Sequence, residues 1–155
     1  MDVEILDSNP YGTLSREDLN EFMAKSHIQL PLDYQEFLLL YNGGRPEPSF
    51  FWIEPRTDGS SVQQFYGVHK GPKHLCIETY TGEERYGIPR SMLPVGDDGI
   101  GNFVCMGIGK ENSGEIFFLD HDVHPYDSPD SMEGITKLAG SMEEFLRGLT
   151  ASPDS

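Results

Sequence analysis

Residues 94–122 read PVGDDGIGNFVCMGIGKENSGEIFFLDHD and contain the clearest strand pattern of the chain. Two apolar runs, Phe103–Ile108 and Glu115–Leu119, lie on either side of GKENSG at residues 109–114. That connection has a glycine at each end and charge at its tip, which is typical of a hairpin loop. Because both runs are continuously apolar, we expect two central strands that are covered on both faces of their sheet.

Acidic clusters bracket this hairpin, DD at residues 97–98 before it and DHD at residues 120–122 after it. Carboxylates and an imidazole at strand ends are compatible with a metal or acid–base site, and also with tight polar turns. Residues 120–130, DHDVHPYDSPD, lack the spacing of a calcium loop, and the chain has no H-E-x-x-H motif. The nearby glycines match neither G-x-G-x-x-G nor Walker spacing. We therefore expect a structural role, with no catalytic residue, no metal and no cofactor.

Two segments near the N-terminus have the periodicity and the capping residues of helices. Residues 13–26 begin at Ser15, an N-cap residue with an acid three positions on. Residues 30–44 place Pro31 in the first turn and end in Asn-Gly-Gly, a sequence that favours the left-handed backbone at a helix end.

A third helix closes the chain at residues 141–149, SMEEFLRGL, where Ser141 and Glu144 have the spacing of a capping box. The helices at both ends enclose a middle region of strands. The sequence therefore predicts an α+β fold, with a central, mainly antiparallel sheet packed against the N-terminal and C-terminal helices. We expect one domain over residues 1–155, with an ordered core at about 13–150.

The segments between the second helix and the hairpin are less regular. SFFWIEP at residues 49–55 predicts a short strand that ends at Pro55. Residues 62–70 fit either a strand or an irregular edge. Residues 74–89 fit an irregular segment with one or two helical turns, which would include the glutamates at 83 and 84.

The charge is strongly acidic, with 26 acidic against 11 basic residues and a net charge of −15. Residues 95–135 contain nine acids and a single base, Lys110. A surface of this kind repels phosphates, so nucleic acid is not an expected partner. It fits a basic protein partner, and it equally fits a surface that is acidic for solubility.

The cysteines and the apolar runs indicate the compartment. Cys76 and Cys105 lie inside apolar runs without metal-site spacing, which predicts buried free thiols. No apolar run approaches the length of a membrane span, and residues 1–12 lack the pattern of a signal peptide. We therefore expect a cytoplasmic protein with no membrane partner.

Several of these motifs together resemble the SUKH superfamily. LPLDYQEFLLLYNGGRPEPSFFWI at residues 30–53 resembles its N-terminal signature, and LPVGDDGIGNFVCMGI at residues 93–108 resembles its second. GEIFFLDHD at residues 114–122 is similar to the third, with Asp122 where glutamate is common. The signatures occur in the family's order, and the closing helix fits as well.

The resemblance implies that the motif residues determine the fold and do not form a catalytic set. The residues expected to have this structural role are Pro31, Tyr34, Phe37, Leu38, Asn42, Gly43, Gly44, Gly96, Asp97, Gly101, Asn102, Asp120 and His121. Within this set, Asn102 and Asp120 are expected to hydrogen-bond exposed backbone at strand ends.

The resemblance also implies function. Many bacterial members look like immunity proteins, which neutralise toxins, often nucleases, by binding them tightly in the cytoplasm. A nuclease binds phosphate and is therefore expected to be basic, which agrees with the acidic charge. Fungal cell-wall-synthesis regulators share the domain, so a regulatory or scaffold module is the alternative. A metal-dependent hydrolase that uses residues 120–122 is a third hypothesis.

The expected contact residues are exposed acids together with one aromatic residue that could serve as an interface anchor. They are Asp97, Asp98, Glu111, Asp122, Asp127, Asp130 and Trp52. Whether the chain pairs with a second copy is left open.

Overall fold

The predicted hairpin is present as strands β7 (Phe103–Gly107) and β8 (Ile116–Leu119) in the computed structural model, which describes residues 3–54, 56–82 and 87–153. Both strands are almost entirely buried, as their continuous apolarity predicts. They are the third and fourth strands of a five-stranded antiparallel sheet, ordered β5-β6-β7-β8-β9.

Three further strands complete this sheet: β5 (Gln64–Phe65), β6 (Met92–Asp97) and β9 (Ile135–Ala139). β6 pairs with β7, and a bulge between Pro94 and Gly96 shifts their register. β9 pairs with β8 and forms one edge of the sheet. β9 was not predicted from the sequence.

Two small antiparallel sheets lie outside the main one. β1 (Glu4–Leu6) pairs with β2 (Arg45–Glu47), and β3 (Phe50–Trp52) pairs with β4 (Gly59–Ser61). β3 is the predicted aromatic strand, while the other three were not predicted. Pro55, which was expected to end β3, lies outside the described residues.

The described residues form three α-helices: α1 (Arg16–Ser26), α2 (Leu32–Tyr41) and α3 (Met142–Gly148). The hydroxyls of Ser15 and Ser141 each accept a hydrogen bond from the backbone N–H three residues on, at 3.1 and 3.0 Å. The predicted α+β fold is therefore confirmed.

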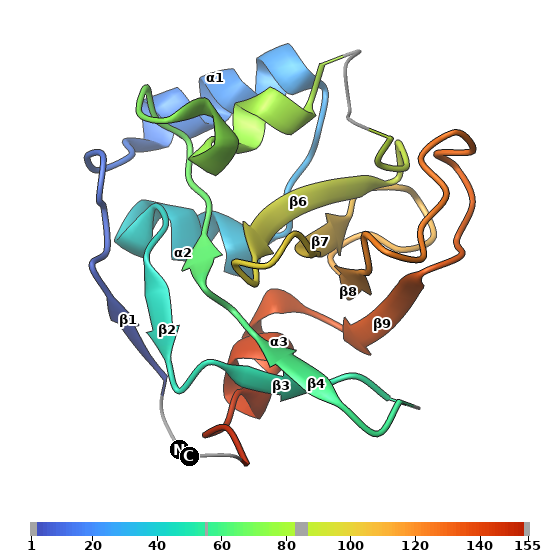
Figure 1. The fold of residues 1–155 in the computed structure, drawn as a ribbon. Helices are drawn as coiled ribbons and strands as arrows, with labels where there is room; N and C mark the ends of the chain where they lie inside the picture. The colour runs from blue at the N-terminus through green and yellow to red at the C-terminus, as the bar shows by residue number, and fades with distance from the viewer. Residues whose placement is uncertain (1–2, 55, 83–86, 154–155) are drawn as a thin grey trace.

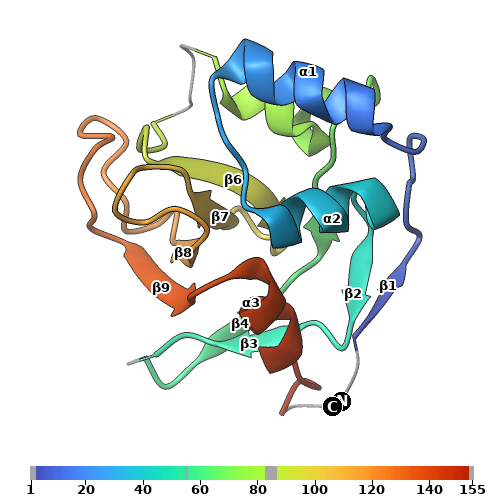
Figure 2. The ribbon, with the colours of Figure 1, turned by 180° about the vertical axis from the view of Figure 1, so that it is seen from behind.

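Figure 2 shows α2 and α3 next to each other on the side that is turned away in Figure 1. Among the described residues, no helix has both the length and the apolar character that a bilayer span requires.

The two ends of α2 differ in how well the sequence predicted them. Pro31 was expected inside the first turn, but it is the N-cap residue, with extended backbone at φ −60° and ψ 151°. Its ring fixes φ but leaves ψ free, so Pro31 precedes the helix without joining it. At the other end Asn42 has left-handed backbone, with φ 40°. The predicted stop at Asn-Gly-Gly is therefore confirmed.

The irregular middle region resolves into short elements. Within residues 62–70 only β5 is a strand. Two short 3₁₀ turns, η1 (Lys73–Leu75) and η2 (Ile77–Tyr80), lie at the start of the segment at 74–89 and are seen beside α1 (Figures 1 and 2). The glutamates at 83 and 84 lie outside the described residues.

Candidate functional site

Asp98 holds the turn between β6 and β7 together. One of its carboxylate oxygens accepts hydrogen bonds from the backbone N–H groups of Ile100 and Asn102, at 3.0 and 3.1 Å. The other accepts from the amide of Asn102 at 2.8 Å and from the hydroxyl of Ser60 at 3.0 Å. Gly99 and Gly101 supply the left-handed backbone that this turn needs, with φ of 78° and 103°.

Asp97 is tied to the same turn and to the core. It accepts a hydrogen bond from the hydroxyl of Tyr66 at 2.7 Å and another from the backbone N–H of Gly99 at 3.0 Å. Burial raises the pKa of Tyr66, and the nearby carboxylate raises it further, so the hydroxyl stays protonated and remains a donor. Asp97 and Asp98 are half-buried, and internal donors occupy their carboxylates.

The DHD cluster at residues 120–122 is joined to this turn through Asn102. The side-chain oxygen of Asn102 accepts from the backbone N–H of His121 at 2.9 Å and lies 2.6 Å from Nδ1 of its ring. One oxygen of Asp120 accepts from the backbone N–H of Asp122 at 3.0 Å. The strand-end hydrogen bonds expected of Asn102 and Asp120 are thus confirmed.

Among the residues that the structure describes, this cluster is the group whose side chains lie close enough together to hold a metal ion. One ligand atom from each of Asp120, His121 and Asp122 lies within 4.8 Å of the others. However, the guanidinium of Arg56 lies 3.1 Å from Asp120, and His121 Nε2 lies 3.2 Å from Asp122. A fixed positive charge beside the carboxylate opposes a cation, so the geometry favours a structural turn.

The connection from β8 to β9, residues 120–134, is here called the acidic loop. It contains five acidic residues and no lysine or arginine. Four of its acids are exposed: Asp122, Asp127, Asp130 and Glu133. Large apolar side chains are exposed among them, Val123 at 49%, Tyr126 at 39% and Met132 at 50%. The acids were predicted as contact residues and these three side chains were not, although a Tyr and a Met in a proline-containing polar loop were a usable signal.

A buried histidine fixes the base of the acidic loop. His124 is 4% exposed, and its Nδ1 lies 2.9 Å from the carbonyl oxygen of Glu133. Its Nε2 lies 2.9 Å from the carbonyl oxygen of Gly87. These contacts join the two ends of the loop and attach it to the segment before β6. The backbone that carries the exposed side chains is therefore fixed at its base.

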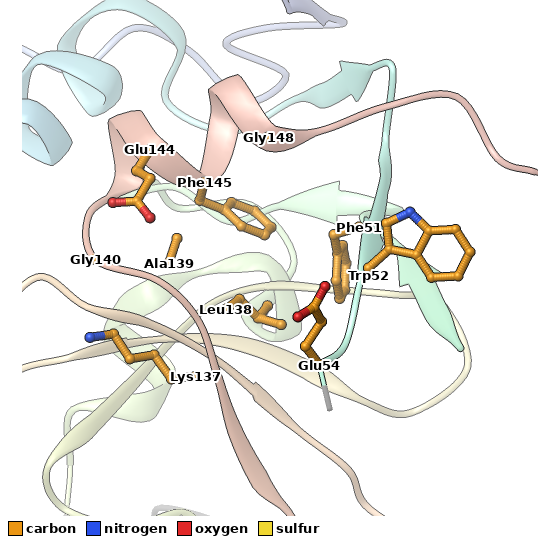
Figure 3. A pocket seen from close by; sticks show the side chains of 10 residues that line it. All are labelled: Phe51, Trp52, Glu54, Lys137, Leu138, Ala139, Gly140, Glu144, Phe145 and Gly148. Atoms are coloured by element: carbon orange, nitrogen blue, oxygen red, sulfur yellow. The ribbon is translucent and has the colours of Figure 1, made fainter. Parts of the chain in front are cut away.

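A groove of about 620 Å³ lies between β9, α3 and β3 (Figure 3). Figure 3 shows the carboxylate of Glu54 beside Leu138 and that of Glu144 beside Gly140 and Ala139, while the amine of Lys137 points away from the groove. Trp52 stands at the rim, 49% exposed. Trp52 was predicted as a contact residue, whereas Glu144 was predicted only as part of a helix cap and Glu54 was given no role.

The predicted contact residues do not form one patch. Asp97, Asp98 and the acidic loop lie at the end of the main sheet where β6 and β8 finish, whereas Glu111 lies in the β7–β8 turn at the opposite end. Trp52 lies apart from both, on β3 beside the edge strand β9. The acids of the acidic loop are therefore the ones that the fold brings together.

Comparison with known proteins agrees with the resemblance read from the motifs. The model of the SMI1 / KNR4 family (SUKH-1) matches residues 13–148. The chain is also similar to the SPbeta prophage-derived uncharacterized protein YokK of Bacillus subtilis (strain 168), with 28% identity over 168 residues, 96% of this chain and 81% of that protein. The family match spans most of the chain, from before α1 to the end of α3, and the chain therefore belongs to the SMI1/KNR4 (SUKH-1) family.

Proposed function

We propose that this chain is a non-enzymatic immunity protein, which neutralises a basic toxin domain in the cytoplasm by binding it. The observation that carries the proposal is the acidic loop. Its exposed acids, Asp127 and Glu133 among them, share residues 120–134 with three exposed apolar side chains, and the loop itself contains no lysine or arginine. A partner with basic residues around an apolar centre would complement this surface.

Two physical effects support this use of the loop. Exposed aromatic and methionine side chains provide the desolvated centre that typical protein interfaces share, and Tyr126 and Met132 are of these types. The surrounding carboxylates steer a basic protein toward the loop and speed association. Family membership is in line with a binding protein.

The arrangement of the polar side chains supports a role without catalysis. The carboxylates of Asp98 and Asp120 and the amide of Asn102 are engaged in fixing turns. A general acid or base needs a side chain that is free to exchange a proton with a substrate. Buried free thiols at Cys76 and Cys105 are consistent with the reducing cytoplasm.

Affinity capture with the intact chain tests the proposal. Lysate from the source cells is passed over immobilised protein and eluted with a salt gradient, and eluted proteins are identified by mass spectrometry. We expect one basic protein, released at high salt, whose toxic activity the chain abolishes. Several non-toxic partners released at modest salt would instead establish a regulatory or scaffold module.

Charge reversal then tests whether the acidic loop makes the contact. The double change Asp127→Lys and Glu133→Lys alters two exposed acids of the loop, and the double change Glu36→Lys on α2 with Glu78→Lys on η2 is the control with the same change in net charge. We expect the loop variant to slow association by about tenfold or more at low salt, with a smaller effect at high salt. Equal effects of loop and control variants would remove the acidic loop from the proposal.

A further inference from the structure

We infer that the groove between β9 and β3 binds an extended segment of the partner, which adds to β9 as a further strand and carries lysine or arginine side chains. The inference rests on the proposed function, because it names the face and the binding mode for a basic partner. Three features of the groove carry it: a free strand edge, uncompensated carboxylates and an exposed aromatic rim.

The free strand edge belongs to β9. Among the described strands β9 pairs with β8 alone, so its outer edge has no sheet partner. The backbone N–H and C=O groups on such an edge are a template for an incoming strand. Extended peptides that bind in this way gain affinity from main-chain hydrogen bonds and specificity from alternate side chains. The groove, at about 620 Å³, is within the roughly 300–1,000 Å³ of ligand clefts.

The charge of the groove selects a cationic segment. Within the described part of the chain, neither Glu54 nor Glu144 takes part in an ion pair. Lys137, the cation on this wall, has its amine 2.6 Å from Glu115 and directed away from the groove (Figure 3). The groove therefore presents two carboxylates whose charge a lysine or arginine of the partner would neutralise.

The rim of the groove supplies an aromatic contact. Trp52 packs edge-on against Phe50, with ring centroids 5.0 Å apart, and this contact holds the indole while half of it stays exposed. A guanidinium stacks well on an indole face, and an aliphatic side chain packs on it equally. An extended segment that alternates cationic and apolar residues would use both properties.

The groove also adjoins the acidic loop. Arg56 follows Glu54 by two residues and lies 3.1 Å from Asp120, the first residue of that loop. A basic protein seated on the acidic loop would therefore reach the groove with a neighbouring segment.

Binding of a synthetic strand tests the inference. The probe is the blocked hexapeptide Val-Arg-Val-Lys-Val-Arg, and its counterpart has glutamate at the three charged positions. Calorimetry measures affinity, and emission of Trp52, the chain's single tryptophan, reports on the groove. We expect saturable binding of the cationic peptide with a change in emission. Equal binding of the acidic peptide, or no saturable binding, would overturn the inference.

Protein variants locate the site. The double change Glu54→Gln with Glu144→Gln removes both charges and keeps the side-chain shapes. Position 144 is the third residue of α3, where glutamine is also a favourable residue. We expect roughly fivefold to tenfold weaker peptide binding in this double variant. Glu17→Gln with Glu78→Gln removes two exposed charges on α1 and η2, elements that do not line the groove, and should leave the affinity unchanged. Equal weakening by both variants would mean non-specific attraction and refute the groove.

Backbone methylation tests the strand geometry. Two further cationic peptides carry N-methyl groups on alternate residues in opposite phases. Because an added strand turns the N–H groups of alternate residues toward the edge, one phase should lose binding and the other keep it. Equal behaviour of the two phases would exclude strand addition. A chain that sediments as a dimer, and that binds no peptide, would assign the edge to a second copy instead.

The two proposals fail in distinguishable ways. If the captured toxin binds the groove variant normally and the acidic-loop variant weakly, the groove inference is wrong and the proposed function stands. If the cationic peptide enters the groove but no toxic partner is found, the groove inference stands and the proposed function is wrong.

Discussion

Replacing Asn42 by alanine removes three side-chain hydrogen bonds from the interior at once. Asn42 is 1% exposed, and its amide donates to the carbonyl oxygens of Gly12 and Val68, each at 3.0 Å. Its oxygen accepts from the backbone N–H of Val68 at 2.9 Å. One side chain therefore joins the end of α2 to the segments before α1 and after β5.

The size of the loss follows from these contacts. Gly12 is exposed and can bind water, but both backbone groups of Val68 stay buried and lose their partner. Each such group costs about 1–2 kcal/mol, and left-handed backbone adds about 1 kcal/mol for alanine over asparagine. We expect Asn42→Ala to lower the free energy of unfolding by about 3–5 kcal/mol, a large part of the roughly 5–15 kcal/mol of a small domain.

Equilibrium unfolding in urea, followed by the emission of Trp52, measures this loss. Asn42→Gly loses the same hydrogen bonds but adopts left-handed backbone freely, so it should be about 1 kcal/mol more stable than Asn42→Ala. Asn20→Ala, at an exposed position of α1, is the control and should change stability by under about 0.5 kcal/mol. A loss below about 1 kcal/mol for Asn42→Ala, at an unchanged m-value, would refute the reasoning.

Two further predictions concern two other buried polar groups, the hydroxyl of Tyr34 and the thiol of Cys76. Tyr34 is fully buried, and its hydroxyl has no hydrogen-bond partner within the described structure. Tyr34→Phe should therefore leave the urea midpoint unchanged or raise it. A decrease of more than about 1 kcal/mol in the free energy of unfolding would reveal a partner for the hydroxyl. Cys76 lies 3.2 Å from Nδ1 of His69, and burial raises the pKa of the thiol and lowers that of the imidazole, which favours the neutral pair. Iodoacetamide should therefore label Cys76 more slowly at pH 7.5 in the folded chain than in urea, as peptide mass spectrometry would measure, and faster labelling in the folded chain would contradict this.

The elements predicted from the sequence are those whose cause is local. Ser15 and Ser141 cap helices through backbone three residues away, and the glycine-flanked turn between β7 and β8 needs only its own residues. β9 was missed because ITKLA is half-buried and becomes a strand only by pairing with β8. β4 consists of Gly-Ser-Ser, which has low strand propensity and depends on pairing with β3.

The candidate site, like the fold, was predictable from the sequence only where its features are local. The acidity of residues 120–134 is visible in the sequence, and so is the exposure of acids between prolines. Sequence alone could not show that Asp98 faces Ser60 across 38 positions, or that Glu54 and Glu144 meet at one groove. Those placements depend on how separate strands and helices are packed together.

The polar residues that hold this fold are separate from those that are free to meet a partner. The side chains of Asn42 and Asp98 each hydrogen-bond several backbone groups, and that of Asn102 binds the backbone N–H of His121 and the carboxylate of Asp98, so changing them costs stability. By contrast, Asp127 and Glu133 are exposed, and within the described residues no ion pair engages their carboxylates. Their charge can therefore change without altering the turns. A scaffold built in this way can acquire a new partner through exposed positions alone, because the contacts that fix its backbone lie elsewhere.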